Sequence, residues 1–232
     1  ALPIFPLYLL PLLSKDTATF NAQADFTPVT RVARVSLGVV VSSASPIKTL
    51  EELIQTLKDK PNELTYSSQG IGSTAHLCCA LFTYMTHTRA QHIPYKSTTA
   101  ATTDVAAGRI SFTIQSPPAI LSLVQAGKLR LLAVTGKQRW AQFPDVRTVQ
   151  EAGVADFEIS SWLDFIAPKG TPQSVLALLN REIQSIARIP EYAEFCKNQS
   201  FSPDIVDYRQ IASEMKSEGA KWKQIVELAL AT

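Results

Sequence analysis

The chain has 232 residues, of which 46% are hydrophobic and 18% charged, which is typical of a globular protein and excludes a disordered or fibrous one. Its formal net charge is only +2, and the basic residues are scattered, so nucleic acid is not an expected partner. No apolar run reaches the ~18 residues that a membrane-spanning helix needs.

The first residues are apolar but do not form a targeting segment. Residues 1–13 contain three prolines and lack the basic region and small-residue cleavage site of a signal peptide. Regular structure is expected only from about Asp25. We therefore expect that the natural N-terminus is missing, or that about the first ten residues are not native.

Strand and helix signals then alternate along the chain. A β-branched run at 34–42 predicts one buried strand. Thr49 and Glu52 form a T-x-x-E capping box that opens a helix to about Asp59. The next elements are expected in this order: strand from 64 and helix 74–85, strand 91–93 and helix 97–107, strand 110–114, turn 115–118, helix 119–126, and strand 129–134.

The C-terminal part is less regular. A loop and a short helix are expected within 144–153, and an extended segment at 157–167. Thr171 as N-cap and Pro172 at the first helical position predict a helix to about Ala187. A last amphipathic helix is expected from Asp207 or Tyr208 to about residue 230, with its apolar stripe in the core.

This alternation predicts an α/β fold, with a mainly parallel sheet and helices on both faces. In such sheets, ligands bind at the carboxyl ends of the strands. The loops at 67–76, 94–98 and 115–118 all follow predicted strands. We therefore expect these three loops to converge.

Residues 64–76 (LTYSSQGIGSTAH) carry the strongest chemical signal. A strand leads into a Gly70-x-Gly72 turn, and Ser73 or Thr74 then caps an apolar helix. Unpaired backbone N–H groups and the positive end of the helix dipole form an anion site at such a turn. The hydroxyls of Ser67, Ser68, Ser73 and Thr74 add neutral donors. This chemistry favours holding a carboxylate or phosphate over breaking one.

Cysteines and histidines do not indicate a metal site. Cys78 and Cys79 are adjacent and Cys196 lies far away, so neither zinc-ligand nor C-x-x-C spacing is present. The three histidines also lack ligand spacing. His76 alone is a candidate for ligand contact, because it lies in the first turn of the helix after the glycine turn.

The same turn also fits a nucleotide-binding pattern. Residues 70–75 (GIGSTA) match G-x-G-x-x-A after a strand, as in dinucleotide-binding enzymes. Such enzymes place an acidic residue about 20 residues further on, and residues 86–103 contain no Asp or Glu. An NADP-dependent oxidoreductase, using Lys96 toward the cofactor, is therefore the alternative hypothesis from a different class.

Several segments together resemble the receptors of tripartite tricarboxylate transporters, also called the Bug or TctC family. No single segment is specific, but their order and spacing match the family from about residue 11 onward. The matching segments are 25–29 (DFTPV), 64–76, 93–96 (IPYK), 127–135 (GKLRLLAVT), 144–146 (PDV), 151–153 (EAG), 161–162 (SW) and 167–172 (APKGTP).

The resemblance implies a type II periplasmic binding protein fold, with two α/β lobes joined by a hinge. Residues 1–40 and 162–232 would form the remainder of lobe 1, and residues 41–161 the ligand-binding lobe 2. The family's opening portion has no counterpart here, so lobe 1 is expected to be truncated. Asp164 stands where a small residue is common in the family, and its role is open.

The resemblance also assigns ligand contacts by position. Tyr95 and Lys96 would join the anion loop from the next loop, and Gln115 and Ser116 stand where the family often has an Asp-Asn pair. The expected ligand-binding set is Ser67, Ser68, Gly70, Gly72, Ser73, Thr74, His76, Tyr95, Lys96, Gln115 and Ser116.

The resemblance thus implies a periplasmic receptor that captures a small organic acid between its lobes and delivers it to membrane transporter subunits. We expect no catalysis, no cofactor, no metal and a monomer. The identity of the acid is open. Besides the NADP-dependent enzyme, the remaining alternative is a non-functional gene fragment with an incomplete cleft.

Overall fold

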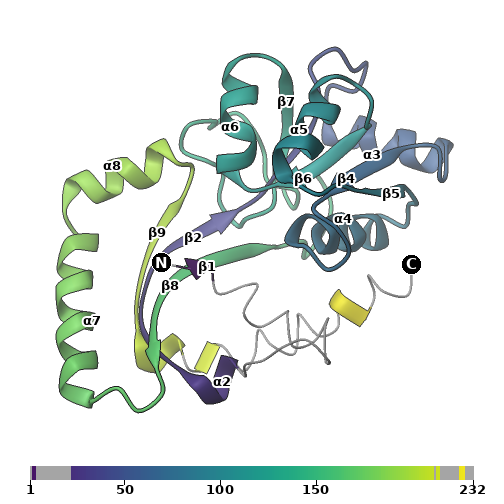
Figure 1. The fold of residues 1–232 in the computed structure, drawn as a ribbon. Helices are drawn as coiled ribbons and strands as arrows, with labels where there is room; N and C mark the ends of the chain where they lie inside the picture. The colour runs from purple at the N-terminus through teal and green to yellow at the C-terminus, as the bar shows by residue number, and fades with distance from the viewer. Residues whose placement is uncertain (1, 4–21, 212, 215–224, 228–232) are drawn as a thin grey trace. The chain divides into compact units, whose positions relative to one another are not determined.

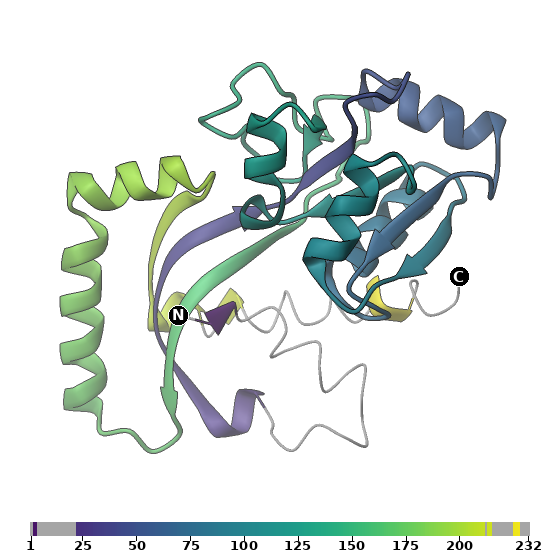
Figure 2. The same cartoon turned by 45° about the horizontal axis from the view of Figure 1, so that its top comes forward.

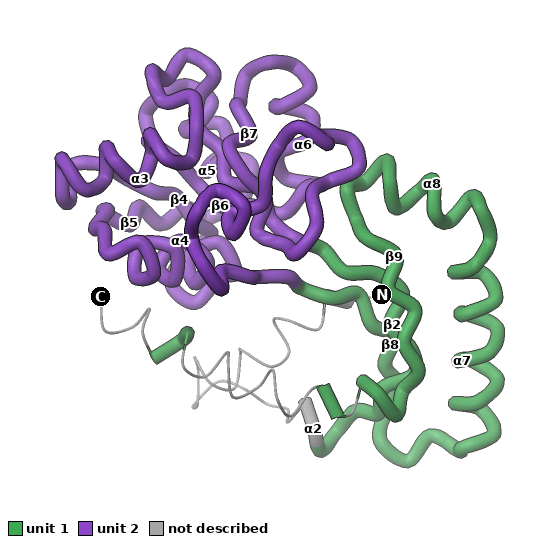
Figure 3. The backbone as a smooth tube through the Cα atoms, turned by 180° about the vertical axis from the view of Figure 1, so that it is seen from behind, with its two compact units in different colours: residues 1–35, 161–227 green, residues 36–160, 228–232 purple. Residues whose placement is uncertain are grey.

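The fold was analysed in a computed structural model that describes residues 2–3, 22–211, 213–214 and 225–227 (Figure 1). The chain divides into two compact units, coloured in Figure 3. Unit 1 contains residues 1–35 and 161–227, and unit 2 contains residues 36–160. These limits lie near the predicted lobe limits after residues 40 and 161, whereas the division into ligand-closing lobes stays a prediction.

Unit 1 is built on a sheet with strand order β1-β8-β2-β9. Helices α7 and α8 lie beside β9 (Figures 1 and 2), and Val29, Ala167 and Leu176 form a small core. The elements are β1 (Leu2–Pro3), α2 (Ala22–Asp25), β2 (Phe26–Ser36), β8 (Ser160–Pro168), α7 (Gln173–Ala187), α8 (Pro190–Asn198) and β9 (Ser202–Asp207).

Unit 2 is a five-stranded sheet with strand order β5-β4-β6-β3-β7. Its elements are β3 (Gly38–Ser42), α3 (Leu50–Asp59), β4 (Thr65–Ser68), α4 (Thr74–Met85), β5 (Gln91–Pro94), α5 (Thr98–Ala106), β6 (Phe112–Gln115), α6 (Pro117–Gln125) and β7 (Leu129–Val134).

Strand direction in unit 2 determines where its helices begin. β4 pairs in parallel with both β5 and β6, whereas β3 lies antiparallel between β6 and β7. Since parallel crossovers are right-handed, α4 packs on one face of the sheet and α5 and α6 on the other (Figure 1). The predicted alternation and the helices on both faces are therefore confirmed, with β3 as the strand that runs the other way.

The predicted single strand at 34–42 is wrong: the structure has two strands, β2 and β3, interrupted at Leu37. There the backbone bonds to Thr135, whose Oγ1 accepts from the Leu37 amide at 2.8 Å and whose amide donates to the Leu37 carbonyl at 2.8 Å. Gly38 follows because a Cβ there would lie 2.6 Å from Leu131 Cδ1. The apolar pattern did not reveal this close packing.

Other boundaries differ more modestly. α6 begins at Pro117 and not after a turn, because proline is well tolerated at the first helical position. The cap of α7 is Pro172 and not Thr171, and residues 144–153 form turns without a helix. The sequence analysis missed α8 and β9. Residues 208–211, 213–214 and 225–227 of the expected last helix are helical, and the rest lies outside the described residues.

The open role of Asp164 is resolved by a buried ion pair in unit 1. Arg31 is 0% and Asp164 1% exposed, and Arg31 Nε donates to Asp164 Oδ1 at 2.9 Å. The guanidinium also pairs with Glu214 and lies 5.2 Å from the ring centre of Trp162. Asp164 and Trp162 therefore connect β8 to β2, and both are interior residues.

Removing one partner of this pair should destabilise the fold. Asp164→Ala is expected to lower the free energy of unfolding by about 3 kcal/mol, because it leaves part of the buried Arg31 charge uncompensated. Urea unfolding followed by circular dichroism measures this. The double variant Arg31→Met/Asp164→Leu should lose less than Asp164→Ala alone, and an equal or greater loss would contradict this account.

Candidate functional site

The carboxyl ends of β5, β4 and β6 bring three loops of unit 2 together. Register places Ser68 of β4 opposite Pro94 of β5, and Tyr66 opposite Phe112 of β6. A direct link confirms the convergence, because the Gln69 side-chain nitrogen donates to Thr98 Oγ1 and to Gln115 Oε1, both at 2.9 Å. The predicted meeting of the loops after residues 68, 94 and 115 is therefore confirmed.

Three helices begin at this edge of the sheet: α4, α5 and α6. None has an acidic residue in its first turn. By contrast α3, which follows the antiparallel strand β3, has Glu51 and Glu52 in its first turn. The positive ends of three helix dipoles therefore meet at one place without a nearby first-turn carboxylate, which favours an anion there.

The glycine turn is held by its own hydrogen bonds. Gly70 and Gly72 have φ angles of 108° and 80°, which side chains rarely adopt. The Gly70 amide donates to Ser68 Oγ at 3.1 Å, and the Gly72 amide donates to His76 Nδ1 at 3.3 Å. Ser73 Oγ donates to the Gly70 carbonyl at 2.8 Å. These two amides are thus satisfied within the loop.

Backbone donors remain at the start of α4. Ser73 is the N-cap, and its Oγ accepts from the His76 amide at 3.3 Å, while the Leu77 amide donates to the Ser73 carbonyl at 3.0 Å. The amides of Thr74 and Ala75 donate to no other described residue. As the first two N–H groups of a helix, they are main-chain donors that this edge can offer to a ligand, as are the Thr98 and Thr99 amides at the start of α5, which likewise donate to no other described residue.

His76 and His92 form a neutral pair behind the loop. Their ring centres lie 4.4 Å apart, and His92 Nε2 lies 2.7 Å from Ser68 Oγ. Burial, with a smaller effect of His92, lowers the pKa of His76 to about 4, and burial also lowers the pKa of His92. Because His76 Nδ1 accepts a hydrogen bond from the Gly72 amide, its proton lies on Nε2.

The other candidate residues differ in what their side chains do. Ser67 is fully buried, and its Oγ donates to the Ala101 carbonyl at 3.4 Å. The Tyr95 hydroxyl donates to Asp104 Oδ2 at 2.6 Å, so it is hydrogen-bonded to a residue of α5. Lys96 is exposed, and Ser116 is the half-buried N-cap of α6 without a side-chain capping bond.

Three residues of the cluster, Gln69, His92 and Thr98, do not belong to the ligand-binding set predicted from the sequence. Gln69 lies between Ser68 and the first glycine, where its long amide links the three loops. Its place directly after a strand was an available signal. His92 could not be found in this way, because its contact with Ser68 depends on the pairing of β4 with β5.

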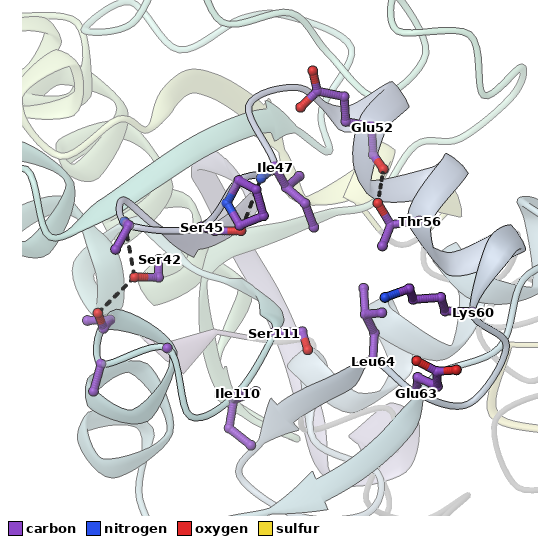
Figure 4. Close-up of a pocket in the computed structure, with 15 residues that line it drawn as sticks. Ser42, Ser45, Ile47, Glu52, Thr56, Lys60, Glu63, Leu64, Ile110 and Ser111 are labelled. Atoms are coloured by element: carbon purple, nitrogen blue, oxygen red, sulfur yellow. Dashed lines mark hydrogen bonds between the residues drawn. The ribbon is translucent and has the colours of Figure 1, made fainter.

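A cavity of about 660 Å³ lies at the opposite edge of the same sheet (Figure 4). Glu52 and Thr56 of α3 line it, together with Lys60, Glu63 and the carbonyl end of α5 at 106–108. Thr56 Oγ1 donates to the Glu52 carbonyl at 2.6 Å. Two carboxylates against one lysine, together with the negative end of a helix dipole, make this cavity less favourable for an anion than the start of α4.

Among the described residues, no cluster of His, Cys, Asp and Glu could hold a metal ion, and no helix has the length and apolarity needed to cross a membrane. Cys78 and Cys79 are fully buried, and burial raises the pKa of both thiols.

Comparison with known proteins identifies the family. Residues 4–230 match the TctC family, described as "Tripartite tricarboxylate transporter family receptor". BugT of Bordetella pertussis is 32% identical over 89% of this chain. The chain spans only 64% of the length of BugT. It belongs to the TctC family, which is a family of binding proteins and not of enzymes.

Solved structures show the same fold. R. palustris Rpa4515, determined with adipate, is 31% identical and superposes with a TM-score of 0.84, covering 92% of this chain and 72% of that one. The periplasmic binding protein BugD gives a TM-score of 0.83 at 23% identity, covering 97% of this chain and 76% of BugD. The α/β periplasmic binding protein fold predicted from the sequence is thereby confirmed.

Acid should destabilise the chain through His76. Its pKa is about 4 in the folded protein and about 6.5 in an unfolded chain, so the unfolded chain binds the proton first. The contribution of His76 to the free energy of unfolding is fully present above about pH 6.5. About 3 kcal/mol of it is lost as the pH falls from 6.5 through 4.

The variant His76→Asn tests this pH dependence. Its side-chain oxygen can still accept from the Gly72 amide, but it cannot take up a proton. The free energy of unfolding, measured by urea titration between pH 4 and 7, should therefore depend less on pH in His76→Asn than in the parent chain. Equal pH dependence of the two proteins would contradict the assignment.

Proposed function

We propose that this TctC-family chain is a periplasmic receptor that binds a small organic carboxylate at the carboxyl edge of the unit 2 sheet. The observation that carries the proposal is the convergence of three helix N-termini, α4, α5 and α6, without first-turn acids. The Thr74 and Ala75 amides supply main-chain donors for one carboxylate group.

Neutral donors suit a receptor that must release its ligand. Hydrogen bonds to a charged group contribute about 1.5–3 kcal/mol each, so a few of them hold a carboxylate without a buried cation. Binding of adipate by the related Rpa4515 supports an organic acid as the ligand. The set from Ser67 to Ser116 predicted from the sequence is retained with distinct roles, since Ser67, Ser68, His76 and Tyr95 support the loops that present the donors.

Closure and delivery are part of the same proposal. Unit 2 acts as the ligand-binding lobe, unit 1 closes over the ligand, and contacts made only in the closed state favour closure. The closed, loaded receptor then delivers the acid to the membrane subunits of a tripartite tricarboxylate transporter, as a monomer and without a cofactor.

A panel of organic acids tests the binding function directly. Thermal unfolding should shift upward by about 5–10 °C at a concentration 100 times the dissociation constant of a true ligand. The panel contains dicarboxylates, tricarboxylates, aromatic acids and amino acids, with NADPH as the competing candidate. Stabilisation by NADPH and by no acid would favour the nucleotide-dependent enzyme and overturn the proposal.

The role of the Thr74 amide can be tested by Thr74→Pro. Proline is well tolerated at the first helical position, and Ser73 has the extended backbone (φ −64°, ψ 155°) that precedes proline. The substitution removes the N–H group and should weaken carboxylate binding roughly tenfold to hundredfold. Isothermal titration with the acid found in the panel measures the change.

Thr74→Ala is the matched control for this substitution. It removes the hydroxyl and keeps the amide, so the difference between the alanine and proline variants isolates the main-chain donor. Equal affinity of the two variants would remove this amide from the site.

A further inference from the structure

Gln115 occupies the centre of the proposed site. It is the last residue of β6, pairs with Gly38 of β3, and is only 3% exposed. It directly precedes Ser116, the N-cap of α6. Its side-chain amide is therefore fixed at the point where the sheet edge meets a helix N-terminus.

Gln69 fixes the orientation of this amide. The Gln69 nitrogen uses both of its hydrogens, one toward Thr98 Oγ1 and one toward Gln115 Oε1, each at 2.9 Å. In this arrangement the Gln115 oxygen faces Gln69 and accepts from its nitrogen. The Gln115 nitrogen is left pointing away from Gln69.

This nitrogen has no partner in the part of the chain that the structure describes. Gln115 Nε2 is buried and makes no hydrogen bond to another described residue. A buried donor without an acceptor costs free energy in a folded protein. A ligand atom with lone pairs, such as a carboxylate oxygen, would remove this cost by accepting from it.

The adjacent helix makes Gln115 the donor that an anion would meet at this position. The first two residues of α6 are Pro117 and Pro118, which have no N–H group. The positive end of the α6 dipole is thus present without the two amides that usually accompany it. Gln115 directly precedes the N-cap residue Ser116, and its side-chain nitrogen carries two N–H donors that can take their place.

We propose that Gln115 is a specificity-determining residue that donates from Nε2 to a carboxylate oxygen of the ligand and disfavours a ligand ammonium group at the same position. This deepens the proposed function and rests on it. With its oxygen bonded to Gln69, Gln115 has its nitrogen, which carries two N–H donors and no acceptor, left for contact with a ligand. An ammonium group, which has no lone pair, finds no acceptor there and meets the positive ends of α4 and α6.

Matched pairs of acids test this selectivity. Succinate, glutarate and adipate each differ from aspartate, glutamate and 2-aminoadipate by one ammonium group. Isothermal titration of the full chain should show that the plain dicarboxylate of a pair binds more tightly than its amino analogue. Tighter binding of the amino analogues would overturn the inference while leaving a carboxylate receptor intact.

The variant Gln115→Glu reverses the chemistry at one position. It still accepts from Gln69 but presents an oxygen where Nε2 stood, so binding of the plain dicarboxylate should fall roughly tenfold to hundredfold. The preference over the amino analogue should shrink or reverse. Gln150→Glu, at an exposed turn of the same unit, adds the same charge and should leave both affinities within about twofold.

The outcomes separate the two claims. If the parent chain binds a dicarboxylate and Gln115→Glu binds it as well as Gln150→Glu does, the role of Gln115 is wrong and the function stands. If the parent chain binds none of the six acids, the function itself is contradicted for this class. Should Gln115→Glu fail to fold, Gln115→Met removes the donor at similar volume, and unchanged affinity in that variant overturns the inference.

Discussion

Parallel pairing of β5, β4 and β6 is the constraint on which the rest of this site depends. Because the three strands run in one direction, their helices α4, α5 and α6 all begin at the same edge. Dipole ends that would be separate in another topology therefore act together. The antiparallel strand β3 sends α3 away from this edge, and the acidic first turn of α3 goes with it. Topology and charge distribution thus agree on which edge is more favourable for an anion.

A second level of organisation makes this edge specific. The glycine turn closes on itself through Ser68 and His76, so its shape is set before any ligand arrives. Gln69 then joins the turn to α5 and β6. Neutral histidines behind the loop keep positive charge out of the interior, and in the proposed site a ligand meets hydrogen-bond donors in place of ion pairs. Such a preformed arrangement limits the ordering cost of binding.

Much of this followed from local sequence. The serine and threonine after the glycine turn placed the start of α4 correctly, and the alternation of strands and helices gave the convergence of the loops. What local pattern could not give were contacts across the sheet. The break between β2 and β3 at Leu37 depends on its hydrogen bond with Thr135. The Gly72 amide is not free for a ligand because it donates to the imidazole of His76. The free nitrogen of Gln115 depends on Gln69, which is distant in the sequence.

The most direct test of the central claim is a crystal structure of the chain grown with the organic acid that stabilises it most in the panel. The account predicts a carboxylate oxygen within about 3.2 Å of the Thr74 or Ala75 amide nitrogen, a hydrogen-bond distance. An acid held instead between α3 and the carbonyl end of α5, with the start of α4 empty, would contradict it.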